Sequence, residues 1–497
     1  MNSHSIPRWR IGAVAAVAVL GLAACAPGSS TAGSTTPAAP TTAAPSSSAA
    51  TSSATGTAGS GSGSGSSSEG QSSSPAGSSS SAPSSAAEPA ITTDPVTLTV
   101  WDQEVRGGQN EQMKQLNDAF MKKYPNVKIT RNSQSFDDLA TTLRLALTDN
   151  EAPDVVQANN GRNTMGAFVT AGQLLPLNTY ADKYGWTDRF PQSVLQYSTY
   201  SEDGKTFGTG NIYGLPQVGE VVGVYYNKKK LKALKLETPK TWEEFEAALA
   251  AAKAAGEIPI ELGNLDKWPA GHVFGPIQGQ FVAADQITDL GLGNAGASWK
   301  TPENEAAAAK LADWVSKGYF NEGPNGTDYD AAWQALTKDQ GVFLIGGSWL
   351  AADLEKAMKD NIGFFAPPPP AGKTVATTGG TGLPFAVTKS SKNPDVAAAY
   401  IDFITNDAAM EVLAKTGNLP VNRTAELAPK SGVQAEVFAA FGEVTTKGAL
   451  LPYLDYATPT AGDVLGQSLQ DLIAAQVDPA EFTQQLEDDY AAFVDGN

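Results

Sequence analysis

Hydrophobic and polar residues follow regular patterns from about residue 91 onward. Val96, Leu98 and Val100 alternate with Thr97 and Thr99, which is typical of a half-buried β-strand. The next predicted elements are a helix carrying Met113, Leu116, Phe120 and Tyr124 that ends before Pro125, a strand at 127–130, a helix at 136–148 and a strand at 154–157. Strands that alternate with helices predict a parallel or mixed α/β sheet.

The same alternation recurs later in the chain. Thr241 and Glu244 have the spacing of a capping box, which predicts a helix from there to Ala255. Pro302 and Pro394 each stand where a first helical turn begins. Apolar runs predict strands at 258–262, 342–345 and 385–388. Because residues 91–497 are too many for one hydrophobic core, we expect two α/β lobes.

The first residues of the chain have the pattern of an export signal. Arg8 and Arg10 precede an apolar run at 11–24, which is shorter than the ~20 residues that a spanning helix needs. We therefore predict a signal peptide at 1–24. The run ends in Leu22-Ala23-Ala24-Cys25, which resembles the lipobox of bacterial lipoproteins and implies that lipid is attached to Cys25. The alternative is a secreted protein in which this cysteine stands by chance.

The segment after the signal peptide has a low-complexity composition. Residues 26–90 consist almost entirely of Ser, Ala, Thr, Gly and Pro, so they cannot bury enough apolar surface to offset the entropy of ordering. We predict that 25–90 is a lipidated cysteine followed by a disordered tether. This tether is either a spacer that crosses a cell wall or a linker of no required length. In both cases we expect residues 91–497 to carry the function of the protein.

Composition excludes several classes of function. The chain has 34 Lys plus Arg against 52 Asp plus Glu, a net charge of −18, which argues against nucleic-acid binding. One Cys and two His exclude a disulfide framework, a Cys-rich metal site and a multi-His catalytic centre. The sequence also has no Walker A loop and no Gly-x-Ser-x-Gly elbow before a helix. We therefore expect no metal and no cofactor.

Short motifs occur in a fixed order along the α/β region. They include Tyr213-Gly214-Leu215-Pro216, Val224-Tyr225-Tyr226-Asn227-Lys228, Pro239-Lys240-Thr241-Trp242, Gly346-Gly347-Ser348-Trp349 and Gly382-Leu383-Pro384-Phe385. Together they resemble family 1 extracellular solute-binding proteins of sugar-type ABC importers, such as maltose- and multiple-sugar-binding proteins. The resemblance implies a periplasmic-binding-protein-like fold, in which several hinge crossings join two lobes around a ligand cleft. By analogy, lobe 1 is about 91–218 and 367–405, and lobe 2 about 219–366 and 406–497.

The resemblance also implies a function in transport rather than catalysis. A protein of this kind captures a mono- or oligosaccharide and delivers it to the transmembrane subunits of an ABC permease. It would lie outside the cytoplasm, anchored by lipid to the cell membrane and extending into or through the cell wall. We expect a monomer that touches the membrane only through its lipid and binds no nucleic acid.

A sugar site needs aromatic planes for the C–H faces and polar groups for the hydroxyls. Trp349 and its neighbour Ser348 follow a glycine turn after a predicted strand, and the resemblance implies an aromatic residue there that stacks on the ligand. Trp268 lies in an irregular loop before Pro269. The alternative for both tryptophans is packing within the lobes.

Polar candidates follow predicted strands or lie at predicted crossings. Ligands bind at the carboxyl ends of strands in open α/β sheets, and the resemblance implies a ligand-binding carboxylate at one hinge crossing, where Glu220 falls. The candidates are Gln103 and Glu104 after the first strand, Asn159 and Asn160 after the third, Glu220, Gly380 and Thr381 at a second crossing, and Asp455 and Tyr456 in the 452–459 loop. The alternatives are an Asx turn at the asparagines, a turn that requires φ > 0 at the glycine, and a solvated charge at Glu220.

Other ligands and one other activity stay open. The broad family also takes polyols, glycerol phosphates and polyamines. A phosphate would need Arg or Lys in the cleft, and only Arg106 and Arg162 lie near the candidate loops; the negative net charge would also slow the approach of an anion. His272 is a lone histidine, more typical of a structural or surface role. Counting acids cannot exclude a surface-anchored glycosidase, because a glycosidase requires only two carboxylates, although no segment resembles a hydrolase.

Overall fold

The computed structural model of the protein describes residues 91–148 and 152–496. The predicted signal peptide, the lipidation site Cys25 and the predicted tether lie outside these ranges. Within the described ranges, no helix is both long enough and apolar enough to cross a lipid bilayer.

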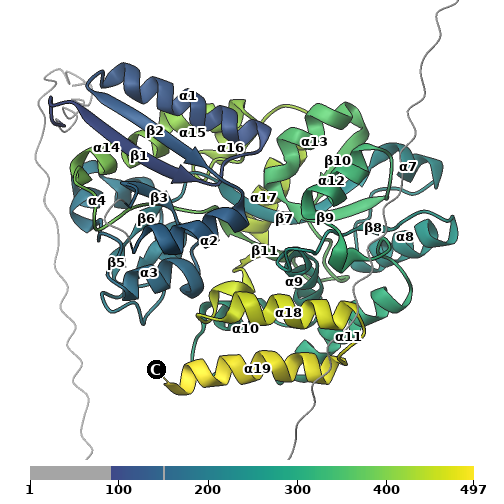
Figure 1. The fold of residues 1–497 in the computed structure, drawn as a ribbon. Helices are drawn as coiled ribbons and strands as arrows, with labels where there is room; N and C mark the ends of the chain where they lie inside the picture. The colour runs from purple at the N-terminus through teal and green to yellow at the C-terminus, as the bar shows by residue number, and fades with distance from the viewer. Residues whose placement is uncertain (1–90, 149–151, 497) are drawn as a thin grey trace, which may run out of the picture. The chain divides into compact units, whose positions relative to one another are not determined.

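The first sheet has the strand order β2-β1-β3-β12-β6 (Figure 1). β1 (Val96–Asp102), β2 (Val127–Ser133) and β3 (Val155–Gln157) run parallel to one another. β12 (Phe385–Val387) pairs antiparallel with β3, and β6 (Gly214–Leu215) pairs antiparallel with β12. The predicted mixed α/β sheet is therefore present, and its parallel strands end on one edge.

Helices α1 (Gly107–Lys123), α14 (Pro394–Thr405) and α15 (Asp407–Lys415) share a core with this sheet. The ring of Phe120 meets the ring of Tyr400 edge-on, with 5.3 Å between centroids. The buried residues of α1 include Met113, Leu116 and Phe120, as the sequence pattern predicts.

The second sheet has the order β13-β11-β7-β9-β8, and β10 also pairs with β7. Its long central strand, β7, is buried at nearly every position, as expected for a strand covered on both faces. The strands are β7 (Gly219–Asn227), β8 (Ile260–Glu261), β9 (Phe343–Gly347), β10 (Ile362–Phe365), β11 (Ala376–Thr381) and β13 (Ala449–Leu451). A separate hairpin pairs β4 (Thr199–Tyr200) with β5 (Asn211–Ile212).

Three stretches of chain meet where the two sheets are connected, two that join strands of different sheets and one around Leu419. Residues 216–218 join β6 to β7, and residues 382–384 join β11 to β12. The Gly382 N–H donates to the Val218 carbonyl at 3.0 Å, and the Gly219 N–H donates to the Leu419 carbonyl at 2.9 Å. The chain therefore passes between the sheets at adjacent, hydrogen-bonded segments, which is the arrangement of a hinge.

Sheet pairing and core packing also group the later segments. β11 belongs to the second sheet, although we predicted that 367–405 would lie in lobe 1. Met410 and Leu413 of α15 lie in the core of the first sheet, although we predicted that 406–497 would lie in lobe 2.

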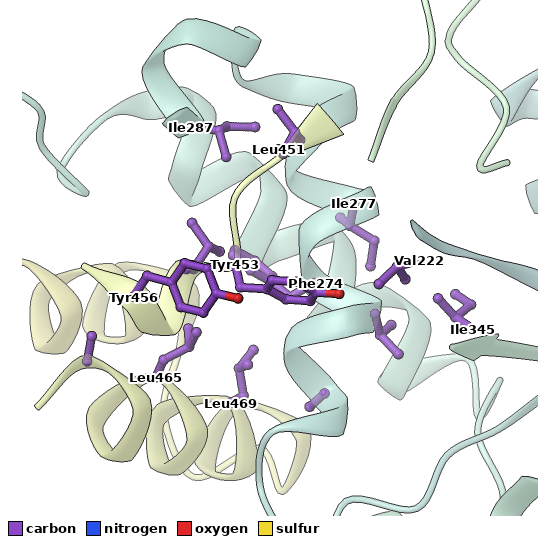
Figure 2. Packing of buried hydrophobic residues seen from close by; sticks show 14 of the residues in the cluster. Val222, Phe274, Ile277, Ile287, Ile345, Leu451, Tyr453, Tyr456, Leu465 and Leu469 are labelled. Atoms are coloured by element: carbon purple, nitrogen blue, oxygen red, sulfur yellow. The ribbon is translucent and has the colours of Figure 1, made fainter. Parts of the chain in front are cut away.

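The remaining helices surround the second sheet and flank the first (Figure 1). In Figure 2, Tyr453 and Tyr456 lie among apolar side chains of α9, such as Phe274, and of α18, such as Leu465. The helices are α2 (Phe136–Ala146), α3 (Ala167–Thr170), α4 (Asn178–Tyr184), α5 (Trp186–Arg189), α6 (Gln192–Leu195), α7 (Lys228–Ala233), α8 (Trp242–Ala254), α9 (Pro269–Phe281), α10 (Ala284–Leu292), α11 (Pro302–Ser316), α12 (Tyr329–Thr337), α13 (Ala351–Met358), α16 (Thr424–Leu427), α17 (Val433–Lys447), α18 (Ala461–Ile473) and α19 (Pro479–Gly496).

The predicted start of α8 is confirmed in detail. The Thr241 hydroxyl accepts a hydrogen bond from the Glu244 N–H at 3.2 Å, which satisfies one free donor of the first turn. The Glu244 carboxylate bonds to the Lys240 N–H at 2.7 Å, one residue before the position that the capping box predicts. Other predicted boundaries differ by a few residues in either direction: α2 and β8 are shorter than predicted, ending at Ala146 and spanning only Ile260–Glu261, whereas β2 extends beyond 130 to Ser133.

Candidate binding site

A cavity of about 560 Å³ lies between elements of the two sheets. One wall carries residues that follow β1 and β3, together with the first turn of α2. The opposite wall carries residues from β7, β11 and the loops before α9, α12 and α18. The volume is within the range of small-molecule sites, and the position between two sheets next to a hinge is typical of ligand clefts.

Aromatic rings gather on one side of the cavity. Trp268 and Tyr329 pack with 4.5 Å between ring centroids. The imidazole of His272 lies 5.2 Å from the ring of Trp268, 5.3 Å from that of Trp349 and 5.7 Å from that of Tyr453. All five residues line the cavity, and both tryptophans keep part of their surface exposed. We call these five residues the aromatic wall.

The turn before Trp349 explains how its ring reaches the cavity. A side chain on Gly347 would place a Cβ atom 2.1 Å from ring carbons of Trp349, so only glycine lets the indole fold back over the end of β9. The indole N–H then donates to the Tyr329 hydroxyl at 2.9 Å. The ring is therefore held in one orientation with one side still open to the cavity.

Glu220 points into the cavity from the start of β7. Its Oε2 accepts a hydrogen bond from the Tyr453 hydroxyl at 2.9 Å. Burial is the main cause that raises the pKa of Glu220 to about 7; the charges of Glu104 and Asp455 add to this shift, and the bond from Tyr453 opposes it. A carboxyl group in this setting changes its charge near neutral pH.

Asp455 and Asn159 form a second polar pair at the cavity surface. Burial raises the pKa of Asp455 to about 6, and a hydrogen bond from the Asn159 side chain opposes this shift. Glu220 and Asp455 are thus partly buried carboxyl groups of the cavity lining, and each has a neutral hydrogen-bond partner from the protein.

A third carboxyl group, Glu104, lies behind the wall and does not line the cavity. Its Oε1 accepts a hydrogen bond of 2.8 Å from the Gln157 side chain, whereas Oε2 is buried with no hydrogen-bond partner in the described residues. Burial raises the pKa of Glu104 to about 7.

His272 is enclosed by the aromatic wall and is 7% exposed. Burial lowers the pKa of its imidazole to about 3, so the ring is neutral at physiological pH. Its Nδ1 is buried and has no hydrogen-bond partner among the described residues. This lone histidine is therefore part of the cavity lining as a neutral ring.

Arg106 crosses from one side of the cavity to the other. It precedes α1, and its Nη2 donates to Oδ1 of Asp330, in the first turn of α12, at 2.9 Å. Its guanidinium also lies over the ring of Tyr329, 5.6 Å from the centroid. Because Asp330 already neutralises it, Arg106 is not a free cation for an anionic ligand.

The structure brings together many of the residues that the sequence predicts for the site. The predicted residues that line the cavity are Gln103, Asn159, Glu220, Trp268, Trp349, Asp455 and Tyr456. Their role in binding remains a prediction.

The other predicted residues have their side chains engaged elsewhere or lie outside the cavity lining. Asn160 donates from its side-chain amide to the Tyr197 carbonyl at 2.7 Å, and the Ser348 hydroxyl accepts from the Val221 N–H at 3.3 Å. Gly380 pairs with Glu220 within the sheet at φ 153°, a conformation that glycine alone adopts readily. The remaining two are Glu104, described above, and Thr381, which is buried in β11.

Several cavity residues were not among the predicted site residues. Phe136 and Asp137 follow β2 as Gln103 follows β1, so the strand-end argument applied to β2 would have found them. Tyr453 precedes the predicted Asp455 in the same loop. Tyr329 opens a helix distant in sequence from the other candidates, and no local pattern indicates its role.

The described residues contain no group of three or more His, Cys, Asp or Glu side chains arranged to hold a metal ion.

Comparison with known proteins identifies the family to which the chain belongs. The sequence profile of the bacterial extracellular solute-binding protein family matches residues 107–411. The multiple sugar-binding protein of Streptococcus mutans is 24% identical over 335 residues, which is 66% of this chain and 75% of that protein. The maltodextrin-binding protein MdxE of Bacillus subtilis is 30% identical over 287 residues, 55% of this chain and 62% of that protein.

A solved structure from work on xylan utilization by Caldanaerobius polysaccharolyticus has the same fold. It superimposes with a TM-score of 0.69 at 23% sequence identity and covers 79% of this chain and 99% of the other. The predicted two-lobed α/β fold is thereby confirmed. With a family profile that spans more than half of its length, and a cavity between two hinged sheets, the chain belongs to the bacterial extracellular solute-binding proteins.

Proposed function

We propose that this protein is the surface-anchored substrate-binding component of an ABC importer and that it captures a carbohydrate in the cavity between its lobes. The observation that carries the proposal is that the aromatic wall, amide groups and carboxyl groups line one cavity. Rings cover the C–H faces of a sugar, and the polar groups pair with its hydroxyls, which are costly to bury unpaired. The names of the relatives in Streptococcus mutans and Bacillus subtilis, for multiple sugars and maltodextrin, support this choice.

Capture would involve closure of the lobes about the hydrogen-bonded crossings. Sheet membership supports a lobe 1 that comprises about 91–217 and 383–420, and a lobe 2 that comprises about 219–381 and 422–496. With these limits Glu220 and Asp455 belong to lobe 2. Gln103 and Asn159 belong to lobe 1, so a bound sugar would touch both lobes and favour the closed form.

The location of the protein is part of the proposal. The sequence at 1–25 supports export and lipid attachment at Cys25, and the composition of 26–90 supports a flexible tether. A lipid anchor with a long tether would keep the binding protein at the outer surface of the cell membrane, within reach of the permease subunits. Relatives in Streptococcus pneumoniae are named as solute-binding lipoproteins.

A thermal-shift screen of the full mature chain tests the proposal. The panel contains mono- and oligosaccharides, polyols, glycerol phosphates and polyamines. A solute that binds only the native state adds about 2.7 kcal/mol of stability at a hundredfold excess over Kd. We expect a clear shift with at least one saccharide and none with glycerol phosphates, because Arg106 is already paired with Asp330.

Overnight incubation with the bound saccharide separates a receptor from an enzyme. Several carboxyl groups line the cavity, and a pair of carboxyl groups is what a glycosidase uses. Recovery of the intact sugar supports the receptor. Cleavage of the sugar, or a shift with non-sugar solutes alone, would contradict the proposed function.

A further inference from the structure

The charges around the cavity are unbalanced. The acidic residues that line it are Asp137, Asp138, Glu220, Asp266, Asp328, Asp330, Asp455 and Asp463, and the basic residues are Arg106, Arg144 and Lys267. A neutral sugar needs hydrogen-bond acceptors but gains little from an excess of negative charge. The imbalance is therefore a property that the binding of a neutral sugar does not explain.

Each basic residue of the lining is already engaged by the protein. Arg106 pairs with Asp330 at 2.9 Å. Arg144 donates to the Asn163 carbonyl at 3.0 Å, and Lys267 donates to the Gln467 side chain at 3.0 Å. None of these three cations forms a salt bridge with Glu220 or Asp455 in the described residues, so none of them compensates either carboxyl group when it is ionised.

The groups that surround Glu220 confirm this lack of compensation. Its hydrogen-bond partner is the neutral Tyr453 hydroxyl, and the charged groups that act on it are Glu104 and Asp455, both acidic. Burial raises the pKa of Asp455 to about 6. At the cavity rim, burial and the nearby Asp266 raise the pKa of Asp137 to about 6. Burial is the main cause of all three shifts, and no cation is among the groups that oppose them.

The aromatic wall suits a cation as well as a sugar. Tryptophan presents the most favourable ring face for an ammonium group, and the attraction grows when water is excluded. Trp268 and Trp349 are partly exposed in the cavity, and between them His272 is buried, with a free Nδ1 that can accept a hydrogen bond in the neutral ring. A protonated amine would thus find carboxylates and ring faces within one cavity.

We infer that the captured solute is an amino sugar or an oligosaccharide that contains one, with a protonated amine held by Glu220 and Asp455. This inference rests on the proposed function, and it names the ligand class within that function. The sugar ring would pack on the aromatic wall, and the ammonium group would replace the missing positive charge near the two carboxylates. An uncharged saccharide of the same shape would leave their repulsion in place.

Calorimetric titration of the full mature chain with matched saccharide pairs tests the inference. The members of each pair differ only in amine in place of hydroxyl at C2, once in glucosamine and glucose and in galactosamine and galactose, and twice in the β-1,4-linked glucosamine dimer and cellobiose. At pH 7 and low salt, we expect the amine member of at least one pair to bind about tenfold or more tightly than its hydroxyl partner. Its affinity should fall as the pH is lowered from 7 to 5, because the two carboxylates take up protons.

Two variants test whether Glu220 and Asp455 are the groups that bind the amine. Glu220→Gln and Asp455→Asn each keep the shape of the side chain and remove its charge, so each should weaken the amine about tenfold and leave the hydroxyl partner nearly unchanged. Two variants are used so that the test survives if one of them folds poorly. Asp182→Asn, an exposed residue of α4 outside the cavity lining, changes the net charge equally and should change neither affinity.

The outcomes separate this inference from the proposed function. The amine inference is wrong if, in every pair that binds, the hydroxyl sugar binds as tightly as the amino sugar. It is also wrong if Glu220→Gln and Asp455→Asn weaken the binding of both members equally. In either case the proposed sugar receptor stands. If no saccharide of any kind binds, including the case in which spermidine alone binds, the proposed function fails and the inference fails with it.

Discussion

The hydroxyl of Tyr453 donates a hydrogen bond of 2.9 Å to Oε2 of Glu220. Glu220 stands at the start of β7, directly after a crossing between the sheets, and Tyr453 follows β13 and belongs to the aromatic wall. The bond therefore connects the hinge side of the cavity to its ring-lined side. It also favours the ionised form of Glu220, whose pKa burial raises to about 7.

Tyr453→Phe removes this bond and leaves the ring in place. The pKa of Glu220 should rise further, because a donor to the charged form is lost. We expect the free energy of unfolding to fall by about 2 kcal/mol at pH 8, where Glu220 is ionised, and by less than half of that at pH 5. Urea denaturation at the two pH values measures the difference.

Tyr456→Phe is the matched control for this prediction. The Tyr456 hydroxyl donates to the neutral side chain of Asn160 at 3.3 Å, so its loss should lower stability by a similar amount at both pH values. Equal losses at pH 5 and pH 8 for Tyr453→Phe would show that the bond to Glu220 does not depend on its charge.

The sequence predicts the positions of the site better than the directions of its side chains. Strand ends placed Gln103 and Asn159 at the cavity, but their neighbours Glu104 and Asn160 point into the protein. All four residues lie beyond the ends of β1 and β3, and the Val105 N–H bonds to the Gln103 carbonyl in a tight turn. The direction of each side chain therefore depends on the local turns of these loops, which the sequence pattern does not predict.

Other parts of the site depend on contacts that no local pattern encodes. Tyr329 reaches the cavity because its helix packs near β8 and β9, and its hydroxyl meets the indole of Trp349. The assignment of β11 to the second sheet also depends on pairing with β7, which lies far away in the sequence. By contrast, α1, α8 and β1 follow from hydrophobic period and capping alone, because these signals lie within one segment.

Trp349→Ala should weaken saccharide binding by about tenfold or more, because it removes a ring face from the aromatic wall. The ring also packs against a buried cluster and bonds to Tyr329, so we expect a loss of about 1 kcal/mol in stability as well. Calorimetric titration with a saccharide from the screen measures the first effect, and thermal unfolding measures the second.

Trp333→Ala provides the comparison for this prediction. Trp333 packs against the same cluster as Trp349, but it does not line the cavity. It should lower stability, and because its indole N–H donates to Asp330 at 2.9 Å, it should weaken binding by no more than the threefold expected for Asp330→Asn, well short of the tenfold expected for Trp349→Ala. Trp349 would be a packing residue rather than a ligand platform if its variant lost stability like that of Trp333 while affinity stayed intact.

The stability of the protein should depend on pH through Glu104. Burial raises the pKa of Glu104 from 4.5 to about 7, so between these values the folded protein holds a proton that the unfolded chain has released. Its contribution to stability therefore decreases as the pH rises through this interval. His272 makes stability depend on pH in the acidic range. Burial lowers the pKa of its imidazole from 6.5 to about 3, so below pH 6.5 the unfolded chain takes up a proton that the folded protein does not, and stability is lost as the pH falls.

Glu104→Gln should remove the first of these dependences. We expect the variant to exceed the parent protein in free energy of unfolding by about 2 kcal/mol at pH 8 and to match it near pH 5. Urea denaturation across this range tests the prediction. Glu443→Gln, an exposed residue of α17, should give the same offset at every pH. A constant offset for Glu104→Gln would instead mean that Glu104 is ionised throughout.

The ion pair of Arg106 with Asp330 should couple solute binding to closure, because it joins the start of α1 to the first turn of α12 across the cavity. The Asp330 side chain is 49% exposed, so the pair itself contributes modestly, about 0.5–1 kcal/mol. We expect Arg106→Gln and Asp330→Asn each to weaken saccharide binding about threefold, and the double variant to be no weaker than either single one. Calorimetric titration of the four proteins gives this coupling. If the losses in the double variant simply add, the two residues act independently and the pair does not contribute to closure.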